Sequence, residues 1–327
     1  MDCINKRMRV VYGDCSLGLH GQDYDYIFSY GAGGMESLVK KGREWLYRAP
    51  KPTFWRALTD NDRGNQLHLR SGMWLAADQF IRCKTVQVLV DGEDQHQPDP
   101  LGNNRFTGLE TATVAEIRYT YETITVPAAI VEVSYRVEAD GRIRVELHYH
   151  GQKGLPELPV FGLRLILPTL ATGFTYEGLS GETYPDRMAG GEPGIYEIEG
   201  LPVTPYLVPQ DCGMHMESKW VRIYPGSSMS NVTKGPLALP AGDGISREDY
   251  LEIHMEDQPF AFSCLPYTAQ ELENATHQEE LPPARRTVLC VMGAVRGVGG
   301  RDSWGAEPEP AYRIDAARDI RYSFSIS

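Results

Sequence analysis

The sequence predicts an all-β protein, a large antiparallel β-sandwich with one or two short helices. Apolar and polar residues alternate through most of the chain, and Gly, Pro and Asx-Gly turns separate the alternating runs. Helical spacing of apolar residues occurs in only two places. The 327 residues are 42% apolar and 23% charged, which is typical of a globular protein with a sizeable core. No repeat or long linker requires a boundary, so we expect a single domain over residues 1–327.

The first fifty residues predict a hairpin-rich start. Alternating runs at 24–30 and 42–47 flank a glycine-rich turn at 31–34. Pro50 and Pro52 follow, and we expect them to break strand pairing because proline has no N–H to donate.

Two segments predict helices, and an Asp/Asn cluster precedes the first. The Asp-Asn-Asp triplet at 60–62 can cap a helix or hold a turn, and no full calcium-loop pattern surrounds it. Apolar residues then recur at helical spacing over 67–80. The second helix is short, because Thr268 and Glu271 form a capping box ahead of residues 272–277.

Strands account for most of the remaining chain. An Asp140-Gly141 pair between two of them signals a tight hairpin. The Gly- and Pro-rich segment 172–213 is expected to be irregular. The predicted strands are 85–90, 115–125, 130–137, 142–150, 160–167, 220–224, 250–256, 287–295 and 320–326.

Charge and cysteine usage limit the classes of partner. A formal net charge of -12 argues against binding to nucleic acid or to an anionic membrane surface. The N-terminus lacks the apolar core of a signal peptide, and no run approaches the length of a membrane span. The six scattered cysteines read as reduced thiols. We therefore expect a cytoplasmic protein that binds a neutral ligand or another protein.

No residue set identifies itself as catalytic or metal-binding. The 44 acidic residues make a carboxylate pair easy to imagine, but no spacing singles one out. The glycines at 297–300 do not form a dinucleotide fingerprint. His148 and His150 alternate along a strand and share a face. Without a third ligand or a carboxylate they make a weak metal case, so we expect strand-surface residues and no metal site.

One aromatic residue, Trp304, ends the loop that follows the predicted strand 287–295. The loop's glycines allow positive φ and close backbone approach. A glycine-flanked Trp outside any helical or strand period is a candidate for a presented ring. A ring folded back onto the sheet is the alternative.

Four motifs together carry a resemblance. They are Phe-Trp-Arg at 54–56 with Thr-Asp-Asn-Asp-Arg-Gly at 59–64, Gly-Glu-Thr-Tyr-Pro-Asp-Arg at 181–187, Leu-Val-Pro-Gln at 207–210, and Gly-Val-Gly-Gly-Arg-Asp-Ser-Trp at 297–304. In this order they resemble the C-terminal domain of long-chain bacterial β-galactosidases of glycoside hydrolase family two, over nearly the whole chain. The chain is most similar to the separate small subunit of two-chain enzymes, because it opens with Met and contains no sugar-binding jelly roll and no catalytic barrel.

The resemblance implies a fold and a division of labour. The family's domain is a very large antiparallel sandwich, a supersandwich similar to galactose mutarotase, packed beside a catalytic barrel. The two catalytic glutamates belong to the barrel, so we expect no catalytic residue on this chain and no activity in isolation. We expect no cofactor on this chain either, with any Mg or Na on the large catalytic subunit that would be its partner. The implied substrate is a β-galactoside such as lactose.

The resemblance also implies roles for particular residues. Trp304, with Ser303 and Asp302 beside it, matches the loop that contributes to sugar binding. An indole face suits the C–H face of a neutral pyranose. A mobile loop that closes over the site corresponds to Gly64 and its neighbours Arg63 and Asn65, because glycine permits the change in φ/ψ.

The second motif is expected to be structural. Its ionisable residues are Tyr184, Asp186 and Arg187, and an Asp beside an Arg in an irregular segment is typical of a structural ion pair. Two other functions stay open. One is a free-standing, mutarotase-like aldose epimerase, for which no motif here places the required His and Glu. The other is a non-catalytic carbohydrate-binding module.

Overall fold

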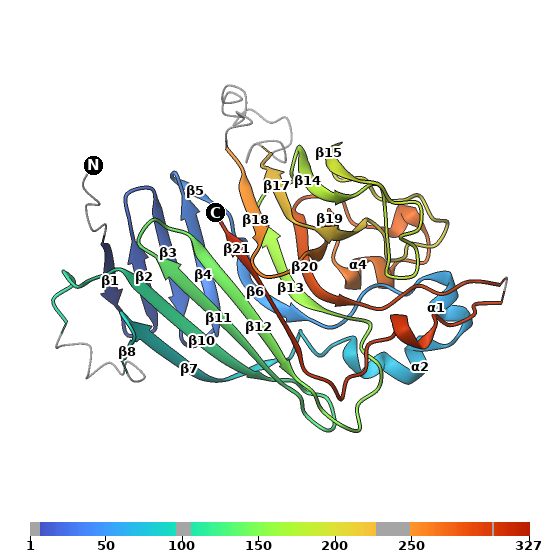
Figure 1. The fold of residues 1–327 in the computed structure, drawn as a ribbon, viewed down its shortest axis with the longest axis horizontal. Coiled ribbons are helices and arrows are strands. Elements are labelled where there is room, and N and C mark those ends of the chain that lie inside the picture. Colours follow the sequence, from blue (N-terminus) through green and yellow to red (C-terminus); the bar gives the residue numbers. More distant parts are fainter. Residues whose placement is uncertain (1–6, 96–105, 227–248, 303) are drawn as a thin grey trace.

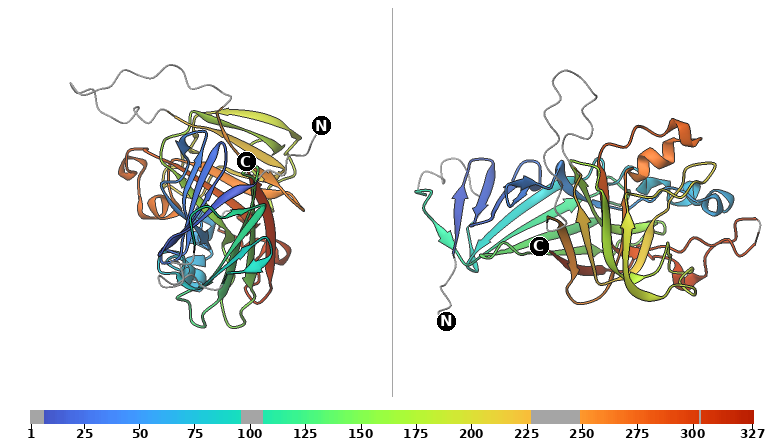
Figure 2. Two further views of the ribbon diagram at one scale, coloured as in Figure 1. Left: turned by 90° about the vertical axis from the view of Figure 1, so that its left-hand side faces the viewer. Right: turned by 90° about the horizontal axis from the view of Figure 1, so that it is seen from above.

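The computed structural model describes residues 7–95, 106–226, 249–302 and 304–327. In the described chain the strands form antiparallel sheets of six, ten and five strands (Figure 1). The ten-stranded sheet is one layer, and the two smaller sheets cover its two halves (Figure 2). The predicted all-β antiparallel sandwich is therefore confirmed.

The six-stranded sheet comes mainly from the N-terminal part of the chain. On β3 the buried side chains of Tyr24, Tyr26 and Phe28 alternate with exposed ones, because successive side chains of a strand point to opposite faces. The Tyr26 hydroxyl donates to the Gly141 carbonyl at 2.7 Å, which links this sheet to the ten-stranded one. The strands are β1 (Met8–Tyr12), β2 (Ser16–His20), β3 (Tyr24–Ser29), β4 (Gly34–Lys40), β5 (Arg43–Glu44) and β9 (Thr111–Ala112).

The ten-stranded sheet contains the predicted hairpin. Gly141 has φ +90, and the strands on either side of it pair in an antiparallel register. The strands are β7 (Arg82–Val90), β8 (Glu93–Asp94), β10 (Val114–Glu122), β11 (Ile130–Glu138), β12 (Ile143–His150), β14 (Gly173–Leu179), β15 (Pro193–Glu199), β17 (Trp220–Tyr224), β18 (Leu251–Met255) and β21 (Ile320–Ile326).

Segment 172–213, predicted to be irregular, contains two of these strands. In β14, Phe174 and Tyr176 are buried at alternating positions, but the glycines at 173 and 178 shorten the apolar pattern on either side of them. Pairing of β14 with β15 on one side and β17 on the other orders the segment, so tertiary context overrides its weak local preference.

The five-stranded sheet corrects another expectation. Its strands are β6 (Arg48–Thr53), β13 (Val160–Leu167), β16 (Met214–Ser218), β19 (Phe260–Leu265) and β20 (Thr287–Val295). Pro50 and Pro52 lie inside β6, which pairs with β13 despite them. Because β6 is the edge strand, a proline can turn its missing N–H side away from the ladder. Strand β19 was not predicted at all.

The helices gather at the end of the molecule where the chain leaves β20 (Figure 1). The predicted helix over 67–80 is shorter than expected, because the α-helical part ends at Ser71 and a 3-10 turn follows from Gly72. In that turn the Trp74 ring points inward, where it stacks on Phe54 and its Nε1–H donates to the Pro156 carbonyl. In the described chain the helical elements are α1 (Asp60–Gly64), α2 (Leu67–Ser71), η1 (Gly72–Trp74), α4 (Ala269–Asn274), η2 (Gln278–Glu280) and η3 (Pro310–Tyr312).

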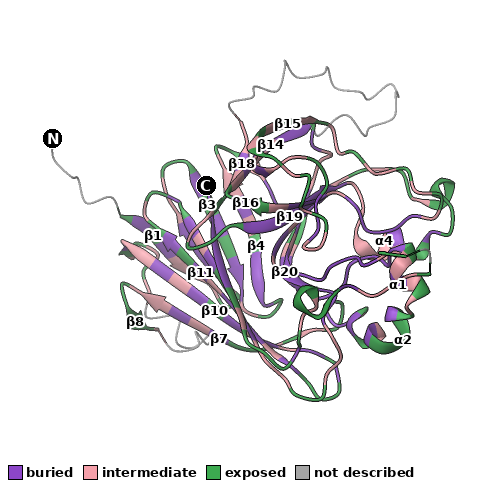
Figure 3. Ribbon diagram, turned by 45° about the vertical axis from the view of Figure 1, so that its right-hand side comes forward, coloured by how far each residue is buried: buried purple, intermediate pink, exposed green. Residues whose placement is uncertain are grey.

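The buried residues lie mainly on the strands, where the sheets face one another (Figure 3). One cluster of buried apolar residues contains side chains from all three sheets. The division of the chain into a single domain stays a prediction. The capping box of Thr268 and Glu271 is present at α4, as predicted. No helix in the described part of the chain is long and apolar enough to cross a membrane.

Candidate functional site

The loop after β20 presents Trp304 to solvent. The Asp302 carboxylate accepts the backbone N–H groups of Trp304 and Ala306, each at 2.9 Å, and so holds the turn between them. The Trp304 residue is 87% exposed, which rules out the alternative of a ring folded onto the sheet in this structure. Ser303 lies outside the described residues.

The base of this loop is held by the second motif. The Asp186 carboxylate accepts the backbone N–H of Val298 at 2.9 Å and that of Gly299 at 2.7 Å. The Arg187 guanidinium donates to the Gly299 carbonyl. A Cβ at Gly297 would lie 2.8 Å from the Asp186 carboxyl carbon, so glycine is required there. The structure therefore places Asp186 and Arg187 as supports of the Trp304 loop.

Tyr184 belongs to the same motif, and its side chain is buried. Its hydroxyl donates to Asp211 Oδ2 at 2.9 Å. Burial raises the pKa of Asp211 to about 7, although the charge of Arg56 acts in the opposite direction. Tyr184 and Asp211 thus form a buried polar contact next to the first motif.

A buried carboxylate joins the first motif to the fourth. Asp62 Oδ2 lies 2.5 Å from Arg56 Nη1, and Asp62 Oδ1 lies 3.2 Å from Arg296 Nη1. Burial acts to raise the pKa of Asp62, but Arg56 and hydrogen bonds from Thr59 lower it overall, so the group stays ionised. All three charged side chains are at most 2% exposed.

The same carboxylate also begins α1. The Thr59 hydroxyl accepts the Asp62 N–H at 3.2 Å, and Asp62 Oδ2 accepts the Thr59 N–H at 3.0 Å, which completes a capping box. The sequence reasoning offered capping for this Asp/Asn cluster but missed the ion pairs. The second arginine is 234 positions away, so no local signal could have found it.

The third motif forms hydrogen bonds with α1. Gln210 Oε1 accepts the Asp60 N–H at 2.7 Å, and Arg63 donates to the Pro209 carbonyl at 3.1 Å. Arg63 also pairs with Asp60 at 3.0 Å. The four motifs, which we call the four-motif cluster (residues 54–64, 181–187, 207–210 and 297–305), therefore meet in space.

Gly64 lies directly against the Trp304 loop. A Cβ on Gly64 would be 3.2 Å from both the Gly305 Cα and the Trp304 carbonyl oxygen. Asn65 follows as the C-cap of α1, and its N–H donates to the Asn61 carbonyl at 2.9 Å. The predicted mobile loop and the predicted sugar-contacting loop are thus neighbours, and glycine on both sides allows their backbones to touch.

Substitution of Gly305 by alanine is expected to destabilise the chain by about 1–3 kcal/mol beyond the cost of backbone strain, because the new methyl group overpacks the contact. Its Cβ would lie 2.9 Å from the Gly64 Cα and 3.0 Å from the Asn61 carbonyl oxygen. Gly42→Ala is the matched control, since Gly42 has φ +77, close to +81 at Gly305, and open space around it. Urea unfolding measures both variants. Equal losses would show that the Gly64 contact is unimportant.

The two histidines form a second cluster that the sequence reasoning did not assemble. Glu132 on β11 lies opposite His148 on β12, with His150 beside it. The expectation of two strand-surface residues without a carboxylate is wrong, because Glu132 faces both rings and His148 is buried. The hairpin register of β11 and β12 was the signal that could have found Glu132.

The sequence is similar to those of known β-galactosidase chains. The family described as "Beta galactosidase small chain" matches residues 20–326. A β-galactosidase small subunit from Latilactobacillus sakei is 60% identical over 99% of this chain and 98% of that protein. A β-galactosidase from Halalkalibacterium halodurans is 32% identical over 98% of this chain but only 28% of that protein. A β-galactosidase from Lactobacillus delbrueckii subsp. bulgaricus is 33% identical over 96% of this chain and 27% of that protein.

Solved structures give a more distant likeness. A galactose 1-epimerase from Lactobacillus acidophilus matches with a TM-score of 0.38 and 9% identity, over 98% of this chain and 97% of that one. A galactose mutarotase related enzyme from the same organism has a TM-score of 0.39 and 7% identity, over 98% of this chain and 96% of that one.

Proposed function

The chain belongs to the β-galactosidase small chain family, and from this membership we propose that it is the small subunit of a heteromeric β-galactosidase. The enzyme would hydrolyse terminal β-D-galactosyl residues such as that of lactose. Two longer β-galactosidases each align with this chain over little more than a quarter of their length. The remaining length of such proteins corresponds to the part that a large catalytic subunit would supply here.

The observation that carries the proposal is the exposed Trp304 on a well-supported loop. An indole left 87% exposed gains apolar contact only when something covers it. A galactosyl ring stacked on its face, with the partner subunit beside it, would provide that cover. The Asp302 turn and the Asp186 contacts hold the loop in place. The loop would therefore lose little conformational entropy when the sugar binds.

The segment from Gly64 is proposed to close over the bound sugar. Arg63 and Asn65 flank it, and the glycine lies against the backbone of the Trp304 loop. A shift in φ/ψ at Gly64 would move the following residues without displacing α1, which the Asp62 capping box and Gln210 hold. The two loops would then act on one ligand from adjacent positions.

The proposed chemistry belongs to the partner. In the four-motif cluster, Asp62 is committed to two arginines, and Asp186 and Asp302 are committed to backbone N–H groups. We propose that the catalytic glutamates, and any Mg or Na, lie on the large subunit and that this chain needs no cofactor for the reaction. The five described cysteines are unpaired, which supports the cytoplasm as the proposed compartment.

Mixing the chain with its large subunit is expected to produce aryl β-galactosidase activity that neither chain shows alone. The physical reason is that the site is completed only by Trp304 and its neighbouring loop. Hydrolysis of an aryl β-galactoside is followed by absorbance while the chain is titrated into a fixed amount of large subunit, and activity should saturate at a fixed ratio. Optical rotation of fresh α-galactose serves as a control for aldose epimerase activity. An enzyme-like hydrolysis rate by the purified chain alone would contradict the proposal.

A further inference from the structure

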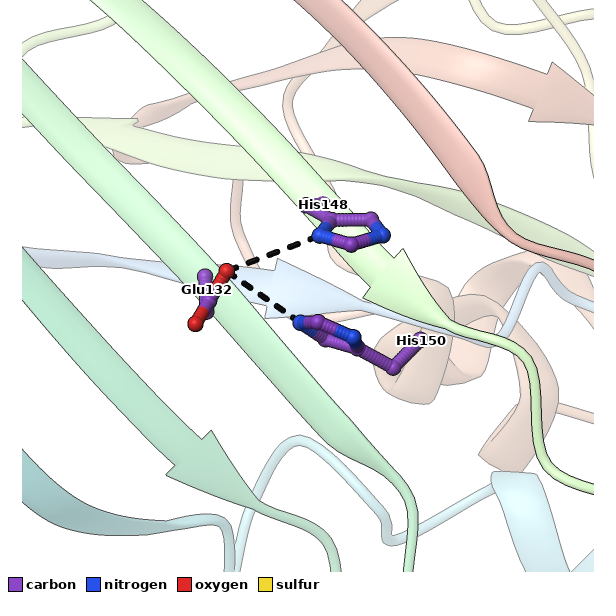
Figure 4. A group of neighbouring side chains, drawn as sticks. All are labelled: Glu132, His148 and His150. Atoms are coloured by element: carbon purple, nitrogen blue, oxygen red, sulfur yellow. Dashed lines mark ion pairs between the residues drawn. The ribbon is translucent and has the colours of Figure 1, made fainter.

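The outer face of the ten-stranded sheet carries a Glu-His-His cluster far from the four-motif cluster in the chain. Figure 4 shows Glu132 on β11 pointing toward both imidazoles of β12. Glu132 Oε2 lies 3.5 Å from His148 Nδ1 and 3.2 Å from His150 Nε2. The two ring centroids are 3.7 Å apart. Three potential ligand atoms therefore converge, all within 4.8 Å of one another.

His148 is oriented by a fourth residue. Its side chain is only 6% exposed, and its Nε2 lies 3.0 Å from Asp319 Oδ2. Asp319 is itself positioned by the backbone N–H of Gly151, which donates to Oδ1 at 2.9 Å. A carboxylate at Nε2 favours the tautomer with its proton on Nε2, which leaves the lone pair of Nδ1 directed at Glu132 and His150.

The nitrogen atoms that face Glu132 have no hydrogen bond in the described chain. His148 Nδ1 and His150 Nε2 are both shielded from solvent and make no hydrogen bond, although each lies within ion-pair distance of Glu132 Oε2. A bound cation would satisfy both at once. Tetrahedral Zn²⁺ with ligand bonds of 2.0–2.1 Å separates its ligand atoms by about 3.3 Å, close to the two distances from Glu132.

The surroundings allow a cation to enter. Beside the cluster is a groove of about 280 Å³, lined by three carboxylates and two arginines, with Glu132 and His148 in its wall. Arg321, the register neighbour of His148 on β21, is one of the two arginines. Apart from the ligand Glu132, the groove has two carboxylates, Glu116 and Glu146, which balance the two arginines. Neutral imidazole with one carboxylate is a ligand set suited to zinc and similar divalent transition metals.

We propose that Glu132, His148 and His150 bind a divalent transition metal ion of the zinc class. Asp319 acts as the positioning residue for His148, and the fourth coordination position faces the groove, where water can occupy it. The bound ion would join β11 to β12. The site is separate from the proposed function, because none of its residues belongs to the four-motif cluster.

Calorimetric titration with zinc chloride tests the site on the full chain after treatment with EDTA and dialysis. The titration is carried out at a mildly alkaline pH, because imidazole binds a metal ion only through an unprotonated ring nitrogen. We expect one ion per chain and a melting temperature that rises with zinc concentration. Cobalt(II) in place of zinc should give the visible absorption of a low-symmetry, four-coordinate ion.

His150→Gln is the decisive variant, because this side chain is 40% exposed and its replacement leaves the core intact. Asp319→Asn removes an outer-shell partner and should weaken zinc binding by about 10- to 100-fold. His150→Gln and Glu132→Gln each remove a ligand, and each should weaken zinc binding by at least that factor. His20→Gln is the matched control, since His20 pairs with Asp25 at 2.6 Å and has no second histidine among its recorded contacts. Its affinity should match that of the unchanged chain.

Two outcomes would overturn the proposal. One is the absence of zinc binding by the unchanged chain. The other is binding that survives both His150→Gln and Glu132→Gln at full strength, which would place the ion elsewhere. His148 is buried, so its substitution would perturb folding as well as metal binding.

Discussion

Asp62→Ala is expected to lower the free energy of unfolding of the chain by about 3–5 kcal/mol, because the buried Arg56 loses its ion pair and Arg296 keeps only its ion pair with Glu157. Arg56 and Arg296 both bond to this carboxylate, and none of the three side chains is more than 2% exposed. The same change removes the capping box of α1. Urea unfolding followed by circular dichroism measures the loss.

Asp60→Ala is the control for this prediction. Asp60 lies two residues earlier on the same helix, its side chain is 71% exposed, and its ion pair with Arg63 is a surface contact, for which about 0–1 kcal/mol is typical. If Asp62→Ala cost no more than Asp60→Ala, the buried network would not be what holds the four-motif cluster together.

Trp304→Ala in the reconstituted enzyme is expected to reduce kcat/KM for an aryl β-galactoside by about 5- to 30-fold, chiefly through KM. Loss of a stacked aromatic face removes about 1–2 kcal/mol of binding, which corresponds to that factor. Folding of the chain should be unchanged, because the residue is 87% exposed. Assembly should also be unchanged, because the proposed contact of the ring face is with the sugar. Steady-state kinetics at saturating small subunit, with size-exclusion chromatography for assembly, separates the two effects.

Two further variants make the Trp304 test specific. Trp304→Phe keeps an aromatic face and should recover most of the lost affinity. Ile195→Ala removes a 65% exposed apolar side chain from β15 and should change neither KM nor assembly. An unchanged KM for Trp304→Ala would remove this residue from the sugar site, whereas loss of assembly would assign it to the subunit interface.

Most of the sheet was predictable because its signals are local. Strands β13, β17, β20 and β21 have the predicted bounds, since each is a continuous apolar or alternating run between turn residues. The Thr268 capping box and the Gly141 hairpin were likewise readable from neighbouring residues. Two kinds of strand were missed: β19, an apolar run that the sequence reasoning overlooked, and strands whose local preference is weak. Strand β6 tolerates two prolines only because it is an edge strand.

The candidate sites divide in the same way. The register of the β11–β12 hairpin follows from its turn, because the pair Val137 and Ile143 beside the turn places Glu132 opposite His148 five residues further along each strand. Glu132 was therefore within reach of sequence reasoning. Asp319 was not, because β21 joins this sheet from the far end of the chain.

The sequence by itself determined the β class, the main hairpin, the Thr268 capping box and the order of four motifs, because each rests on side-chain periodicity or on contacts between near neighbours. Only the tertiary structure decided that the motifs meet. Asp62 reaches Arg296, Asp186 holds Val298, and Gly64 touches Gly305, each across more than a hundred residues of chain. Those contacts depend on how the sheets pack and where β20 ends, and no local pattern encodes that placement.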